Sequence, residues 1–146
     1  IDDLERCFDI VAEHSETVRR LMTIPGVGAQ TATAIVASVG NAQQFDKARD
    51  FAAWLGLVPR QYSTGGKPRL GRITKRGDTY LRTLLVHGTR AVLARVADKQ
   101  DRLSQWCKGV IERRGYKRAT VALAAKNARI IWAMLRSGTE YKAFAA

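Results

Sequence analysis

The sequence predicts an all-α fold, a compact multi-helix domain with a helix-hairpin-helix-like motif and a long basic loop. Apolar residues recur at helical spacing along most of the chain, and capping and turn residues separate these stretches. No segment of convincing length alternates in the manner of a strand. At 146 residues the chain has the size of one domain with a substantial core.

The first helix is predicted over residues 2–22, where apolar side chains recur every three or four positions and acids lie between them. Residues 1–16 carry a net charge of −5, which leaves +17 on residues 17–146. We assign 1–22 to an N-terminal helix, the end of a truncated helical linker, because the chain begins at Ile1 rather than at methionine. Residues 23–146 form the main domain. A solvated acidic face explains the carboxylates of the helix better than a metal site does.

A hairpin turn is predicted next, at Ile24-Pro25-Gly26-Val27-Gly28, followed by a helix that ends at Gly40. Two glycines around an apolar residue allow a tight turn and leave backbone N–H groups free at the start of the following helix. Such an end is positively polarised and binds phosphate. The pattern matches the helix-hairpin-helix module, which contacts the DNA backbone without reading its sequence. A plain helical hairpin with packing glycines is the alternative.

Four further helices complete the prediction. Asp46 is expected to cap a short helix that runs to Leu57, and Asp78 a long one that runs to Ala97. Residues 101–114 form another helix that ends at Gly115, and a last one covers about 117–136. A core or interface role suits His87 better than that of a general base. Basic residues around Gly115 form either a second backbone contact or an exposed turn: Lys108, Arg113, Arg114, Lys117 and Arg118.

The long basic loop lies within residues 56–80 and reads GLVPRQYSTGGKPRLGRITKRGDTY. It contains Ser63 beside the pair Gly65 and Gly66. Loops of this length are uncommon unless they are functional or disordered. Its six basic residues are accompanied by no acid, and they are Arg60, Lys67, Arg69, Arg72, Lys75 and Arg76.

Composition points to a polyanionic partner. The formal net charge is +12 and the pI about 10.4, which favours nucleic acid first and an anionic membrane surface second. No apolar run approaches the roughly 20 residues that span a bilayer, and no signal-peptide pattern is present. We therefore expect no membrane partner and a cytoplasmic location. Cys7 and Cys107 form no CxxC spacing, and the two histidines complete no metal site.

The loop can support covalent chemistry better than metal chemistry. Two-metal hydrolysis needs acids that hold ions about 4 Å apart, and the chain has no acid between Asp50 and Asp78. A serine nucleophile instead forms a phosphoserine and needs cations around the phosphate oxygens. Ser63 meets this need in outline, although no neighbouring histidine or aspartate is evident to take its proton. From the residues alone, an ordinary loop serine remains the alternative.

The order of motifs resembles the C-terminal transposase domain of an insertion-sequence family. The matching segments are IPGVG, FAAWLGLVPRQYSTGGK, ITKRGD and the Ala-rich last helix with Leu135 and Tyr141. The resemblance covers nearly the whole chain from about Leu21, and GLVPRQYSTGGK is its most specific part. These transposases pair an N-terminal resolvase-like domain, which carries a DEDD set of acids, with this serine domain, and they are bridge-RNA-guided recombinases.

This resemblance implies that Ser63 is the catalytic nucleophile. It implies no cofactor in this chain, and Mg²⁺ held by the resolvase-like domain of the full-length protein. DNA, a guide RNA, the resolvase-like domain and further copies of the full-length protein are the implied partners, in a bacterial or archaeal nucleoid. The family's downstream signature matches Lys67, Arg69, Gly71, Lys75, Arg76 and Gly77, with Thr74 where serine is also common.

Two functional hypotheses follow. The preferred one is the C-terminal catalytic domain of a DNA transposase or recombinase, which as an isolated fragment binds nucleic acid without recombining it. The alternative is a non-catalytic helix-hairpin-helix module that binds DNA for a repair or recombination protein. An RNA-binding protein is a weaker third option. The candidate nucleic-acid-binding residues are Gly26, Val27, Gly28, Arg60, Lys67, Arg69, Arg72, Lys75 and Arg76.

Overall fold

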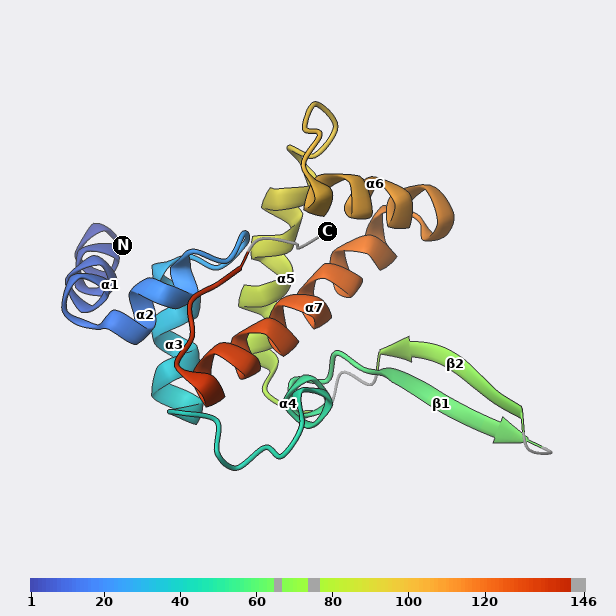
Figure 1. The fold of residues 1–146 in the computed structure, drawn as a ribbon, viewed down its shortest axis with the longest axis horizontal. Coiled ribbons are helices and arrows are strands. Elements are labelled where there is room, and N and C mark those ends of the chain that lie inside the picture. Colours follow the sequence, from blue (N-terminus) through green and yellow to red (C-terminus); the bar gives the residue numbers. More distant parts are fainter. Residues whose placement is uncertain (65–66, 74–76, 143–146) are drawn as a thin grey trace.

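The protein consists of a helical body from which a two-stranded ribbon projects (Figure 1). The computed structural model describes the backbone of residues 1–64, 67–73 and 77–142. Side chains are described for residues 1–58 and 77–142. The helices in these ranges are α1 (Asp2–His14), α2 (Glu16–Met22), α3 (Ala29–Val39), α4 (Ala48–Trp54), α5 (Thr79–Leu93), α6 (Arg102–Arg114) and α7 (Tyr116–Ser137). The predicted all-α body is confirmed.

The predicted basic loop contains regular structure, which is a correction. Strands β1 (Pro59–Thr64) and β2 (Lys67–Ile73) pair in antiparallel fashion, with Ser63 opposite Pro68 and Thr64 opposite Lys67. An irregularity in the register lies between Pro59 and Gln61. The segment gives little apolar alternation because an isolated ribbon buries little surface, so its pairing leaves no clear periodic pattern.

The predicted single helix over 2–22 is also wrong, because the chain breaks at Ser15. Ser15 has extended backbone angles, and its hydroxyl accepts a hydrogen bond from the amide of Val18. It therefore ends α1 and caps α2, as serine favours. Leu4 and Ile10 on α1 stay largely exposed, whereas Val18 and Leu21 on α2 are buried in the core.

Aspartate side chains cap two of the other helices, whereas the cap predicted at Asp46 is absent. Asp78 and Asp101 accept hydrogen bonds from the amides of Leu81 and Ser104, so both cap as aspartate should. Asp46 does not cap α4. The cap position is Lys47, whose amide donates to the carboxylate of Asp50 at the third helical position.

Helix α7 organises the main core because it packs against α4, α5, α6 and α2. Its buried stripe includes Ala124, Ala128 and Ile131, and the small alanines allow a close approach of neighbouring helices. A second, smaller cluster around Cys107 and Leu123 joins α6 to the ends of α5 and α7. Within the described ranges, every helix falls short of what a bilayer crossing needs in length or apolar character.

The base of the ribbon is clamped between α4 and α5. Gly77 has a φ of +98°, and a Cβ at this position would lie 1.7 Å from the carbonyl oxygen of Trp54. The Asp78 amide donates to the same oxygen, and the guanidinium of Arg82 donates to the Leu55 carbonyl at 3.2 Å. The chain therefore leaves α4 and enters α5 at nearly the same point, which fixes where the ribbon starts.

The turn between α2 and α3 is seated directly on α5. A Cβ at Gly88 would lie 1.8 Å from the carbonyl oxygen of Gly26, so the two backbones touch. From the other side, the buried Asn127 of α7 donates from Nδ2 to the Pro25 carbonyl at 2.9 Å. Only glycine permits this approach at position 88. Two long helices therefore hold the turn in place.

This contact predicts opposite effects for two helical glycines. Gly88→Ala forces its methyl group into the Gly26 carbonyl, so we expect a loss of about 1–3 kcal/mol of folding free energy. Gly109→Ala in α6 meets only the end of the Arg113 side chain, at 3.4 Å. It should be neutral or stabilise by up to about 1 kcal/mol through helix propensity. Urea denaturation measures the free energy of unfolding of both variants. Equal stability of the two would contradict the close contact between Gly88 and Gly26.

Candidate nucleic-acid interface

The predicted hairpin exists as a turn of defined geometry between α2 and α3. Ile24 and Val27 are buried, and the Val27 amide donates to the Ile24 carbonyl at 3.0 Å. Gly26 has a φ of +93°, which favours glycine, whereas the φ of Gly28 is −93°. The apolar residues anchor the turn, so its glycines lie where the sequence predicted them.

The N-terminus of α3 faces outward from this turn. Gly28 is its N-cap, is exposed, and supplies no side chain to accept a hydrogen bond from the first amides of the helix. The space where a Cβ of Gly28 would lie is open. The first N–H groups of a helix have no partner within that helix, and they carry the positive end of its dipole. This end can accept an anionic oxygen.

A cleft of about 660 Å³ lies between this turn and α5. Arg95 and Lys99 line it and bring positive charge beside the turn. Asp101 also lines it, but its carboxylate accepts hydrogen bonds from the hydroxyl and amide of Ser104 at 2.6 and 3.1 Å. The Ser104 hydroxyl, helped by its amide, lowers the pKa of Asp101 below its ordinary value. The cleft therefore has mixed charge, and its positive groups are the turn amides and two long side chains.

Most of the predicted loop residues lie on the ribbon. Arg60 and Ser63 belong to β1, and Lys67, Arg69 and Arg72 belong to β2. The Cα register places Tyr62 opposite Arg69 and Ser63 opposite Pro68, so the serine and that arginine lie in neighbouring pairs of the ladder. For these residues the structure describes the backbone and the strand pairing, but not the side chains. Lys75 and Arg76 lie outside the described residues altogether.

The buried cysteine of α6, Cys107, is unsuited to nucleophilic chemistry. Burial raises the pKa of the Cys107 thiol to about 11, so this cysteine stays protonated at neutral pH and is a poor nucleophile. The described residues contain no group of three or more His, Cys, Asp or Glu side chains that could hold a metal ion.

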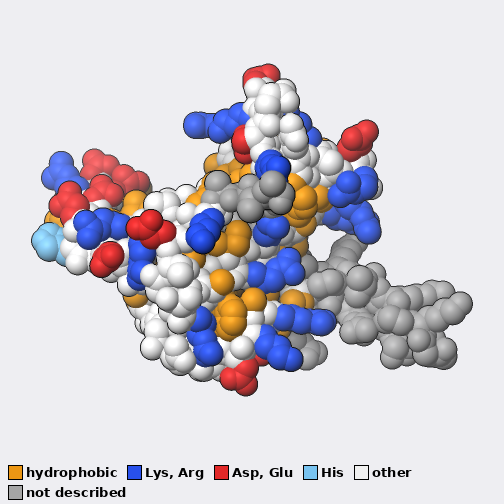
Figure 2. All heavy atoms as spheres, viewed as in Figure 1, with side chains coloured by type: hydrophobic (Ala, Val, Ile, Leu, Met, Phe, Trp, Pro, Cys, Tyr) orange, Lys and Arg blue, Asp and Glu red, His pale blue; other side chains and the backbone are white. Residues whose placement is uncertain are grey.

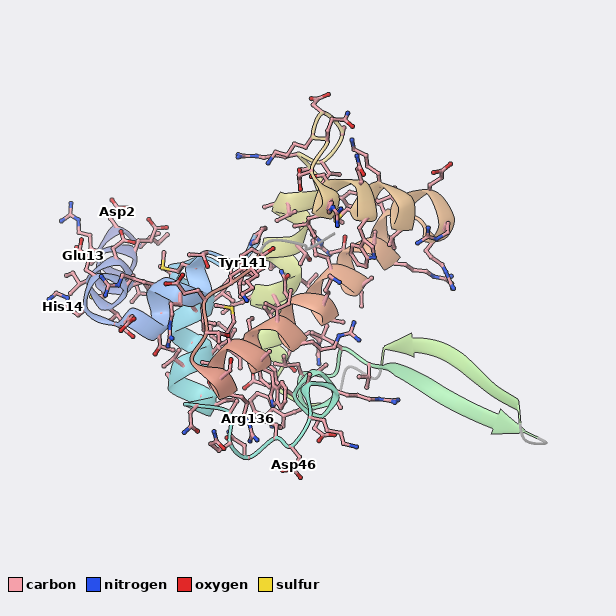
Figure 3. The ribbon with its side chains drawn as sticks, in the orientation of Figure 1. Asp2, Glu13, His14, Asp46, Arg136 and Tyr141 are labelled. Carbon is pink, nitrogen blue, oxygen red and sulfur yellow. The ribbon has the colours of Figure 1, made fainter. Side chains whose placement is uncertain are left out.

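Charge is separated along the molecule. Asp2, Glu13 and His14 lie on α1, at the end of the molecule away from the ribbon (Figure 3). Acidic side chains gather over α1, whereas Lys and Arg side chains spread over the α7 side of the body (Figure 2). A polyanion is therefore repelled by the acidic side chains of α1 and attracted to the basic side chains of the rest of the body.

Sequence reasoning missed several cationic side chains because only the fold brings them to a cleft. Arg95 and Lys99 follow α5 in a stretch without a recognisable motif, yet they lie beside the hairpin turn.

His87, interpreted as a core or interface residue, is exposed, so the core interpretation is wrong. Of the patch around Gly115, Lys108 donates to the Lys99 carbonyl, and the exposed members are Arg113, Arg114, Lys117 and Arg118.

Comparison with known proteins gives a consistent result. A family model described as "Transposase IS116/IS110/IS902 family" matches residues 18–105. A Pseudomonas aeruginosa protein named "Probable family 20 transposase" is 52% identical over 139 residues, which cover 95% of this chain and 41% of that protein. The transposase for insertion sequence element IS1111A of Coxiella burnetii is 51% identical over 142 residues, 97% of this chain and 39% of the relative.

A third relative extends the pattern to lower identity. The transposase for insertion sequence element IS1328 of Yersinia enterocolitica is 42% identical over 141 residues, 97% of this chain and 42% of its own length. The chain thus spans about two fifths of the length of these relatives, and the match includes the hairpin turn, the ribbon and α5.

Proposed function

The chain belongs to the IS116/IS110/IS902 family of transposases, and we propose that it is the part of a DNA transposase that cleaves and rejoins strands through a phosphoserine on Ser63. The observation that carries the proposal is the position of Ser63 on an acid-free ribbon that projects from a basic helical body. The family match and the transposase names of the relatives support DNA as the substrate.

In the proposed step, Ser63 Oγ attacks the phosphorus of one phosphodiester. The bond from Oγ to phosphorus forms as the bond from phosphorus to the leaving sugar oxygen breaks, and that sugar hydroxyl takes up a proton in place of the one the serine gives up. The resulting phosphoserine conserves the diester, so the hydroxyl of a second strand can reverse the step and seal a new junction. The ribbon cations would neutralise the charge that builds on the non-bridging oxygens.

The chain supplies part of the chemistry only. Because the described residues offer no group of acids for a divalent ion, we propose that Mg²⁺ is held by a resolvase-like domain elsewhere in the full-length protein. A guide RNA and a second copy of the full-length protein are further proposed partners, since recombination joins two DNA molecules. On this proposal the 146-residue chain binds DNA without recombining it.

The hairpin turn is proposed to position the DNA. Its α3 amides would donate to a phosphate oxygen, with Arg95 and Lys99 nearby in the same cleft. This contact reads no bases, so it sets the orientation of the duplex and leaves sequence choice to other parts. The same geometry favours the second candidate function, a non-catalytic module that binds DNA for a recombination partner, in which Ser63 would be dispensable.

Removing the nucleophile decides between the two functions. In the full-length protein with guide and target DNA, Ser63→Ala should abolish the denaturation-resistant protein–DNA adduct, a loss of at least about a thousandfold. Ser38→Ala, which removes an exposed hydroxyl from α3, should leave the adduct intact and is the control. An adduct that persists in Ser63→Ala means that another residue is the nucleophile or that the chain is not catalytic.

A charge at the hairpin turn tests the phosphate contact. Asp and Asn are both good N-caps, so Gly28→Asp and Gly28→Asn should keep the fold, with stability changed by only a few tenths of a kcal/mol. Only Gly28→Asp places a negative charge at the α3 amides. We expect about tenfold weaker binding of a short DNA duplex for Gly28→Asp and a smaller loss for Gly28→Asn, because either capping oxygen competes for the α3 amides but only Asp adds a negative charge. Fluorescence anisotropy measures both, and equal affinities would contradict the contact.

A further inference from the structure

A second groove lies between α5 and the first turns of α7, and its volume is about 640 Å³. Positive side chains occupy both of its walls, with Arg82 and Arg90 on α5 and Lys117 on α7, and His87 of α5 also lines it. The remaining lining residues are neutral, so within the described part of the chain no carboxylate lines this groove. The cleft beside the hairpin turn, in contrast, contains Asp101.

The groove and the hairpin turn lie on opposite faces of α5. Gly88 touches the hairpin turn, whereas Val86 and Arg90, two positions to either side, line the groove. At 3.6 residues per turn, two positions correspond to a rotation of about 200° around the helix axis. One anion bound at the turn amides therefore cannot also occupy the groove, and the two places are separate sites.

We propose that this groove binds a second segment of nucleic-acid backbone, separate from the segment held at the hairpin turn. The proposal takes nucleic acid as the partner from the proposed function, but it concerns a different site. Arg90, His87 and Lys117 are exposed and therefore accessible to an incoming phosphate. Three cationic side chains, with no acid among the described residues that line the groove, are the electrostatic footprint of a phosphate-binding surface.

The dimensions fit one strand. Arg82 and Arg90 are eight positions apart, which is about 12 Å along α5 at 1.5 Å per residue. Phosphates of one strand in a duplex advance about 3.4 Å along the axis and lie farther apart along the strand itself, so a strand in the groove presents only a few of them to these side chains. Tyr116 forms part of the far wall, where its hydroxyl donates to the Arg90 carbonyl at 3.3 Å and ties α7 to α5.

One end of the groove lies at the base of the ribbon. Arg82 lines the groove and also donates to the Leu55 carbonyl, where the chain leaves α4 for β1. A strand bound in the groove would therefore leave it close to the point from which the ribbon with Ser63 projects. Because Arg82 has this structural hydrogen bond, it is unsuitable as a probe, and Arg90 and Lys117 are the informative positions.

The test compares two double variants of the 146-residue chain that remove the same charge. Arg90→Gln with Lys117→Gln empties the groove of two exposed cations. The control, Arg6→Gln with Arg19→Gln, removes two exposed cations from α1 and α2. Binding of a short DNA duplex and of a single-stranded RNA is measured against salt concentration. We expect the groove variant to lose on the order of tenfold or more in affinity and about two units of salt slope, and the control to change little.

The outcomes separate the hypotheses. Loss with both probes, or with only one of them, supports the groove and in the latter case identifies DNA or RNA as its ligand. If the groove variant and the control variant bind nucleic acid with equal affinity and equal salt dependence, the groove is not a binding site. The proposed function is unaffected by that result. If the unmodified chain binds neither the DNA duplex nor the RNA, the result contradicts both the proposed function and the groove proposal. A groove variant that changes only self-association in sedimentation shows a protein interface and also overturns the proposal.

Discussion

The close approach of two glycine backbones is the constraint on which the arrangement of this protein depends. Because Gly26 and Gly88 touch, the turn between α2 and α3 lies against the middle of α5, and Asn127 holds it from α7. The same helix begins at the base of the ribbon, where Gly77 packs on the Trp54 carbonyl. Helix α5 therefore links the hairpin turn, the ribbon and the groove on its opposite face. Displacing it would disturb all three together.

Electrostatics complement this arrangement. The acidic side chains of residues 1–16 lie on α1 and the start of α2, whereas the ribbon sequence is basic and contains no acid. A polyanion is steered by this asymmetry toward α5, α7 and the ribbon. The described residues contain no group of three or more His, Cys, Asp or Glu side chains that could hold a metal ion.

The sequence predicted local structure well wherever one cap or one periodic stripe decides it. Asp78, Asp101 and Gly115 bound their helices as expected, and the turn predicted at residues 24–28 lies between α2 and α3. It failed where competing local interactions decide, as at Ser15, which splits the first helix. The ribbon was not predicted, because an isolated pair of strands needs no buried face and so imposes no alternation of apolar and polar residues. The clefts could not be predicted, because only tertiary packing brings Arg90 and Lys117 to the lining of one groove. The catalytic assignment of Ser63 stays a prediction.

The central claim is that nucleic acid contacts both faces of α5 and avoids α1. The most direct test is an NMR titration of the 146-residue chain with a short DNA duplex, followed through its backbone amide signals. The account predicts shifts at Gly28 and the first amides of α3, and at Arg90 and Lys117 in the groove, with α1 amides unchanged. Shifts concentrated on α1, or absent at both the turn and the groove, would contradict it.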